Sequence, residues 1–139
     1  MIALRVLHVH SASFRYTLKK ATSMAEPPAR NGEVLENVLV CFTCFERHDE
    51  PRIDTLIDQF IDTLKRDVER LQCNSVLRYP YAHLSKHLVN PGRARTFFDE
   101  LQIRLLQQGF DAHKAPFGWY KTYHMECIGH PLSEAYREY

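Results

Sequence analysis

One segment near the C-terminal end combines a lysine with aromatic neighbours in a strand-like alternation. Trp119, Lys121 and Tyr123 share one face of the predicted strand, and that face is the more apolar of the two. An ammonium group there is costly unless it is paired or has a function. The pattern leaves two interpretations. The amine of Lys121 reaches solvent at the sheet edge, or it faces a pocket and binds a carbonyl or a charged group.

Two further segments place polar side chains where sites commonly lie. His83 follows two tyrosines and a proline in a loop after a short predicted strand. It could act as a base, as a hydrogen-bond donor or as a capped core histidine. Glu134 lies in a polar turn near the C-terminus, and taken alone it is a surface carboxylate.

Other kinds of chemistry have weaker support. Cys41 and Cys44 form a CxxC in a predicted strand, where residues three apart point to opposite faces. His8 and His10 share one strand face as a possible ligand pair, without an assignable third ligand. Cys127 has no assignable histidine partner, and no GxSxG, GxGxxG or GxxxxGK motif occurs. The sequence therefore predicts no metal, no cofactor and no covalent intermediate.

The composition is that of one globular domain spanning residues 1–139. Hydrophobic residues make up 45%, charged residues 25%, and the formal net charge is +1. A chain so close to neutral is expected to contact RNA only locally, or with help from other domains. The four cysteines form no dense disulfide framework, and we expect no signal peptide and no membrane span. A reducing, cytoplasmic setting follows as the expectation.

The elements needed to position these residues are mainly strands with two helices between them. The first helix has apolar residues at helical spacing up to Leu71, with Pro51 at its first position and Asp49 or Glu50 before it. The second begins at Asn90-Pro91 and ends at Gly109. The tail from Gly129 to Tyr139 is expected to be partly helical. Strands are predicted over residues 2–9, 14–21 (returning from the first), 34–45, 75–78, 110–117 and 119–128.

Three motifs in order resemble one family. They are Tyr-Pro-Tyr-Ala-His-Leu-Ser at 79–85, Ala-Pro-Phe-Gly-Trp-Tyr-Lys at 115–121 and Gly-His-Pro-Leu-Ser-Glu at 129–134. Together they resemble the N-terminal editing domain of archaeal threonyl-tRNA synthetase over essentially the whole chain. The resemblance implies an α/β fold like that of D-aminoacyl-tRNA deacylases, a mixed sheet with two main helices, and a homodimer. It also implies metal-free, RNA-assisted removal of L-serine from the 3′ end of the tRNA for threonine.

The resemblance also assigns roles to residues. It implies functional roles in the pocket for Lys121, His83, Tyr120 and Glu134, and a substrate-lining role for Pro80, Ala82, Phe45 and Phe117. The catalytic and anticodon-binding domains of a synthetase are expected partners, in cis or in trans.

Two alternatives stay open, and a departure from the family pattern supports the second of them. The first strand of the family commonly ends in a histidine, a small residue and an aspartate, whereas this chain has His10-Ser11-Ala12. The alternatives are a D-aminoacyl-tRNA deacylase and a non-catalytic tRNA-binding or dimerisation module.

Overall fold

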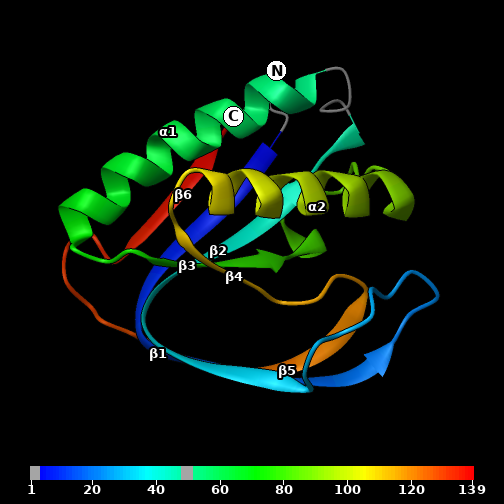
Figure 1. Cartoon of the computed structure of the whole chain (residues 1–139), viewed down its shortest axis with the longest axis horizontal. Coiled ribbons are helices and arrows are strands. Elements are labelled where there is room, and N and C mark those ends of the chain that lie inside the picture. Colours follow the sequence, from blue (N-terminus) through cyan, green and yellow to red (C-terminus); the bar gives the residue numbers. More distant parts are fainter. Residues whose placement is uncertain (1–3, 48–51) are drawn as a thin grey trace.

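The sheet is built around one long, strongly curved strand. The computed structural model describes residues 4–47 and 52–139. In it β1 (Leu4–Ala21) pairs antiparallel with β2 (Gly32–Phe45) along nearly its whole length. On its other edge, β1 pairs with β6 (Glu134–Glu138) through its first half and with β5 (Trp119–Cys127) through its second half. This curl forms the lower half of the molecule in Figure 1.

Both helices lie on the same face of the sheet (Figure 1). Helix α1 (Ile53–Leu71) connects β2 to β3 (Ser75–Pro80), and helix α2 (Pro91–Gln107) connects β3 to β4 (Asp111–Lys114). The three strands are parallel neighbours in the order β4-β3-β2. Two successive crossovers of the usual right-handed kind, proceeding in one direction, leave both helices on one side. The predicted α/β mixed sheet with two main helices is confirmed.

The helix boundaries follow local chemistry. The side chain of Asn90 accepts a hydrogen bond from the Arg93 amide at 3.0 Å, which caps α2 as expected. Gly109 follows with a φ of +86°, a conformation that costs glycine little. The predicted helix start at Pro51, and with it Asp49 and Glu50, lies outside the described residues. Neither helix in the described ranges is long and apolar enough to cross a membrane.

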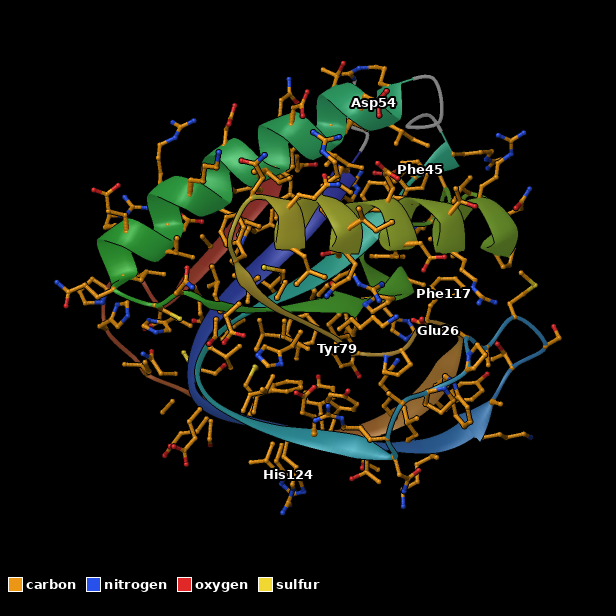
Figure 2. All side chains as sticks on the ribbon, in the orientation of Figure 1. Glu26, Phe45, Asp54, Tyr79, Phe117 and His124 are labelled. Atoms are coloured by element: carbon orange, nitrogen blue, oxygen red, sulfur yellow. The ribbon has the colours of Figure 1, made fainter. Side chains whose placement is uncertain are left out.

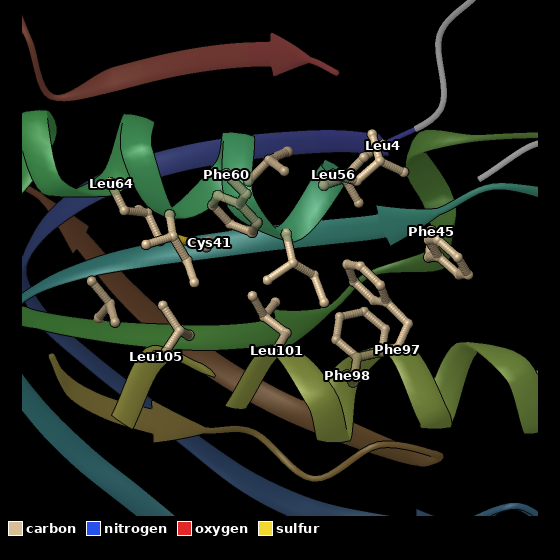
Figure 3. Close-up of a cluster of buried hydrophobic side chains, with 14 of the residues drawn as sticks. Leu4, Cys41, Phe45, Leu56, Phe60, Leu64, Phe97, Phe98, Leu101 and Leu105 are labelled. Atoms are coloured by element: carbon tan, nitrogen blue, oxygen red, sulfur yellow. The ribbon is translucent and has the colours of Figure 1, made fainter. Parts of the chain in front are cut away.

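The main core fills the space between the helices and the sheet (Figure 3). Its side chains come from the apolar stripe of each helix and from alternate positions of β1 and β2. Burying apolar surface in this way is the main driving force for folding. The fully buried members include Leu4, Leu56, Phe60, Leu64, Phe97 and Leu101. A second cluster lies inside the curl of the sheet and is dominated by aromatic rings, among them Phe14, Phe42 and Tyr79.

The expectation of two separate strands before residue 21 was wrong. Val9 and Phe14 both belong to the cluster inside the curl although they are five positions apart, so the alternation changes parity between them. Ala12 is skipped in the pairing with both neighbours, and opposite it Asn37 has a φ of +47°. The break in the sequence pattern therefore marks a bend within one strand, with no reversal of the chain.

The expectation of a partly helical tail was also wrong. Residues Glu134–Glu138 form β6, which pairs with the first half of β1. Arg137 in this strand donates two hydrogen bonds to Asp67 of α1, at 2.6 and 3.0 Å. The strand is held by backbone pairing and an ion pair and has no alternating apolar face. The periodicity of the sequence therefore does not reveal it. β4 is likewise shorter than predicted, because the chain leaves the sheet after Lys114.

Candidate functional site

A cavity of about 560 Å³ opens beside the carboxyl ends of β2 and β3. Its walls come from these strand ends, the short helix η2 (Ala82–Leu84), the first turns of α2 and the start of β5. The size is that of pockets that enclose small organic ligands, and the lining is mostly apolar with a few polar groups. Of the predicted site residues, seven contribute to it: Phe45, Pro80, Ala82, His83, Phe117, Tyr120 and Lys121.

The side chain of Lys121 places a positive charge in the lining of this cavity. Trp119, Lys121 and Tyr123 all line it, whereas His124 points away from the interior on the outer side of the curl (Figure 2). The alternation predicted from the sequence is thus confirmed for this stretch. The Lys121 amine lies 5.0 Å from the centre of the Tyr79 ring and donates a hydrogen bond to the Trp119 carbonyl at 3.1 Å. Both contacts hold a cation among apolar neighbours.

The surroundings of Lys121 weaken its basicity. Burial, together with the positive charge of Arg78, lowers the pKa of Lys121 from 10.5 to about 8, and Glu26 opposes this shift only in part. The amine is therefore still mostly protonated at pH 7 and loses its charge as the pH rises through about 8. A protonated amine in a partly dehydrated cavity is suited to stabilise negative charge that develops on a substrate oxygen.

The loop with His83 forms another part of the cavity lining. It leaves β3 after Pro80, and the Tyr81 amide donates to the Thr43 carbonyl at 2.8 Å, which fixes the start of η2. The rings of Tyr81 and His83 meet edge to face, with centroids 5.2 Å apart. His83 itself is exposed, so its imidazole can reach a ligand at the mouth of the cavity. His83 and Lys121 thus line the same cavity.

Two phenylalanines of the cavity wall, Phe45 and Phe117, pack against rings of the main core. Phe45 stacks on Phe97 with ring centroids 4.3 Å apart and an interplanar angle of 5°. Phe117 packs against Phe98 at 5.8 Å. Because these partners belong to the core between helix α2 and the sheet, the wall they form is rigid. An apolar wall of aromatic rings suits an aromatic ligand such as a nucleobase.

A buried ionic cluster that the sequence did not reveal supports the loop after β4. Glu26 accepts hydrogen bonds from the Phe117 amide at 2.6 Å, from Lys114 at 3.0 Å and from Arg78 at 3.4 Å. Its own carbonyl accepts from the Trp119 indole at 2.9 Å. Figure 2 shows Glu26 beside Phe117 at the edge of the interior. Glu26 thus fixes the residues on both sides of Gly118 and, through them, the start of the strand that bears Lys121.

Burial alone would raise the pKa of Glu26. The Phe117 amide and the cations Lys114 and Arg78 outweigh burial and lower that pKa below its ordinary value, so the carboxylate is charged at neutral pH. Nothing in the sequence around Glu26, which is followed by Pro27 and Pro28, indicated this role. Arg78 offered the only hint, as a cation within an otherwise apolar strand.

Gly118 allows the tight approach between this loop and residues 22–26. Its φ is +82°, and a Cβ atom at this position would lie 2.7 Å from the Cα of Ala25.

We expect Gly118→Ala to lower the free energy of unfolding by about 2 kcal/mol or more, through left-handed backbone strain plus the clash. Urea unfolding measures this. Gly129→Ala is the matched control, because Gly129 has a φ of +86° but nothing within 4 Å of an added Cβ. Equal losses in the two variants would contradict the proposed clash.

Two predicted residues are placed differently from the rest. Tyr120 lies at the cavity rim with its side chain 65% exposed, so it reaches the cavity only from outside. Glu134 does not line this cavity. It pairs with Val9 on β1, whereas Lys121 pairs with Leu18, and the two sites are separated by roughly 30 Å of strand. Within one chain the structure therefore does not bring Glu134 and Lys121 together.

The histidine and cysteine pairs considered as metal ligands are held by other contacts. His8 is buried against Phe60 and Cys41, and burial, aided by Arg137, lowers the pKa of His8 to about 4. His10 instead contacts Asn37 at 2.8 Å and His130 at 2.9 Å. Cys41 belongs to the core on the helix side and Cys44 to the cavity wall, as their spacing predicted. Within residues 4–47 and 52–139, no group of three or more His, Cys, Asp or Glu side chains could hold a metal ion.

Comparison with known proteins identifies relatives that share nearly the whole chain. The threonine–tRNA ligase of Methanoregula boonei is 39% identical over 131 residues, which cover 94% of this chain and 21% of that protein. The threonine–tRNA ligase editing subunit of Saccharolobus solfataricus is 36% identical, covering 95% of this chain and 33% of the subunit. The ligase of Methanocaldococcus jannaschii is 33% identical, covering 97% and 22%.

The chain thus spans between about a fifth and a third of the length of these curated relatives. A family model, described as the archaea-specific editing domain of threonyl-tRNA synthetase, matches residues 4–139. This match includes every strand and helix described above and all the residues that line the cavity. The chain belongs to the family of archaea-specific editing domains of threonyl-tRNA synthetase.

Proposed function

We propose that this domain hydrolyses the ester bond of L-seryl-tRNA for threonine and so removes wrongly attached serine. The observation that carries the proposal is the Lys121 ammonium group, held inside an apolar cavity beside the His83 loop. An ester carbonyl placed in this cavity would have a cation available to its oxygen, and an adenine would have the Phe45 and Phe117 wall. The membership of an editing family supplies the substrate class.

Serine is the amino acid that a threonine enzyme rejects poorly. It lacks one methyl group, and one methylene-sized difference in a pocket gives only about 10- to 200-fold discrimination. A second site that hydrolyses the smaller product is the general solution to this problem. We propose that the cavity with its phenylalanine wall provides this second selection step.

The reaction that we propose is direct attack by water on the ester carbonyl. The oxygen of water forms a bond to the carbonyl carbon, and negative charge develops on the carbonyl oxygen. The bond to the 3′ oxygen of the ribose then breaks, and that oxygen takes up a proton to leave free serine and a 3′-hydroxyl. Lys121 would stabilise the oxyanion or orient the water, while His83 and Tyr120 position the substrate by hydrogen bonds.

The lining offers no carboxylate as a general base among the described residues. We therefore propose that the neighbouring 2′-hydroxyl of the terminal ribose assists the water. In this scheme the site uses no metal. Its described lining holds only Cys44 and His83 of the usual nitrogen and sulfur ligands, and neither belongs to a group of three.

A homodimer is part of the proposal. β5 is an edge strand of the sheet, and Tyr123, Met125 and Ile128 in and after it are between 37% and 42% exposed. An exposed apolar edge strand is suited to pairing with another chain. Glu134 lies outside the cavity of its own chain, so its proposed role would require a second copy to carry it there. The catalytic and anticodon-binding domains of a synthetase would hold the body of the tRNA, in cis or in trans.

A deacylation assay with mischarged tRNA tests the proposal. We expect rapid release of serine from L-seryl-tRNA for threonine, slow release of threonine from the cognate threonyl-tRNA, and the same rates after treatment with EDTA. D-aminoacyl-tRNA, assayed in parallel, separates this function from that of a general D-aminoacyl deacylase. Binding of tRNA without turnover would show a non-catalytic module, and loss of activity in EDTA would contradict the metal-free mechanism.

A further inference from the structure

We propose that a second hollow, contiguous with the cavity through His83, binds the phosphodiester group that precedes the terminal adenosine of the tRNA. This inference rests on the proposed function, because it assigns the next part of the same substrate. The hollow has a volume of about 330 Å³. Its lining consists of Arg5 and the consecutive residues His83, Leu84, Ser85, Lys86 and His87.

The two hollows are adjacent in the way that a continuous RNA strand requires. His83 lines both of them, so the two hollows meet at this residue. With the terminal nucleoside ester in the apolar cavity, the chain can leave past His83 into the second hollow. Aromatic rings and prolines predominate in the lining of the first hollow, which suits a nucleoside. Basic side chains line the second, which suits the phosphate backbone.

The loop that forms the second hollow is built into the fold. The Ser85 hydroxyl donates to Glu46 at 2.9 Å and accepts from the His87 amide at 3.0 Å. The Arg47 amide donates to the His87 carbonyl at 2.8 Å, which fastens the far end of the loop to the end of β2. A site of this kind needs little rearrangement when a ligand binds.

Among the described residues, the hollow has one cation, Lys86, that no carboxylate pairs with. No carboxylate side chain lines it among the described residues. Arg5 is engaged by Glu46 and Glu138, so its charge is largely balanced. Lys86 is exposed and forms no ion pair with a carboxylate of the described residues, which leaves its charge for a ligand. Phosphate contacts from single lysines position RNA without reading its sequence.

The near-neutral net charge makes such a local contact useful. A chain with a formal net charge of +1 has no broad basic face with which to attract RNA. A single cation beside the cavity would position the 3′ end of the tRNA without requiring a broadly basic surface. It would also tell a tRNA end from a free aminoacyl nucleoside, because only the former carries a phosphodiester there.

Comparison of two substrates for the variant Lys86→Glu tests this inference. One substrate is L-seryl-tRNA, and the other is the L-seryl ester of adenosine, which lacks any phosphate. We expect the ratio of kcat/KM for seryl-tRNA to kcat/KM for seryl-adenosine to fall about tenfold at low salt. The slope of log kcat/KM against log salt for seryl-tRNA should become less steep by about 1, whereas Lys86→Arg should retain both values.

Lys65→Glu is the matched control, because it makes the same charge change on helix α1, where Lys65 contacts Gln108 and lines neither hollow. Equal substrate ratios in Lys86→Glu and Lys65→Glu would overturn the phosphate subsite while leaving the proposed function intact. An equal loss on both substrates in Lys86→Glu would overturn it as well. If the unchanged chain hydrolyses neither ester, the proposed function fails first and the subsite falls with it.

Discussion

Replacing Lys121 by methionine is expected to lower kcat for deacylation of seryl-tRNA about 10²- to 10³-fold, the usual loss when one donor to a developing oxyanion is removed. Methionine fills nearly the same space beside Tyr79 and carries no charge. The substrate would still bind through the apolar wall and the His83 loop, so KM should change much less than kcat. Single-turnover deacylation separates the two parameters.

The pH dependence gives this prediction a second readout. Because the cation is the active form and its pKa is about 8, the enzyme-catalysed excess over spontaneous hydrolysis should fall as the pH rises through about 8. In Lys121→Met the small remaining excess should lose this step. A step at the same pH in the variant would assign it to another group.

Stability separates a catalytic role from a structural one. The folded state lowers the pKa of Lys121, so between about 8 and 10.5 the unfolded chain binds more protons and the free energy of unfolding rises with pH. Below that window the buried charge opposes folding. Lys121→Met removes this penalty and should be at least as stable at pH 7.

Lys65→Met, on the solvated face of α1, is the control that should alter neither rate nor stability. An unfolded Lys121→Met, or a fully active one, would contradict the proposed role.

The parts of the fold that the sequence predicted well are those set by local periodicity. The apolar spacing from Leu56 to Leu71 requires a helical stripe, and the Asn90-Pro91 pair predicts a helix start that the observed cap confirms. Strand alternation placed Lys121 on the more apolar face but left open whether its amine reaches solvent or faces a pocket, and the structure places it in the cavity lining. In each case residues within two turns, or within one strand, carry the information.

The parts that were missed depend on contacts between distant residues. The bend near Ala12 shifts the apolar alternation by one residue, as a turn between two strands also would. Only the pairing with β2, where Asn37 lies opposite, shows that β1 continues. β6 is held by backbone pairing and by the Arg137–Asp67 ion pair. The separation of Glu134 from Lys121 likewise depends on which part of β1 each strand pairs with, and no motif spacing encodes it.

Glu26 is the most consequential of these missed residues, and its replacement tests how the site is supported. We expect Glu26→Ala to lower the free energy of unfolding by about 3 to 5 kcal/mol, the typical effect of removing one partner from a buried ion pair. Arg78 is fully buried, with its Nε and Nη1 atoms lacking hydrogen-bond partners in the described structure. Without Glu26 its guanidinium would have no carboxylate within ion-pair distance among the described residues.

Replacing the other partner, Arg78, should lower the free energy of unfolding by less than Glu26→Ala does. This difference distinguishes a buried ion pair from a contact that only packs well. In Arg78→Met, Glu26 keeps the Phe117 amide and Lys114 as donors, and methionine can still pack on Phe98 in place of the guanidinium that lies 5.1 Å from the ring centre. We therefore expect Arg78→Met to remain folded and to raise the pKa of Lys121 toward its ordinary value, because a neighbouring positive charge is gone. The pH at which the catalysed rate falls should then move upward from about 8. If Arg78→Met destabilises the domain as much as Glu26→Ala, or if that pH stays where it was, Glu26 and Arg78 serve only packing and do not set the charge of the catalytic amine.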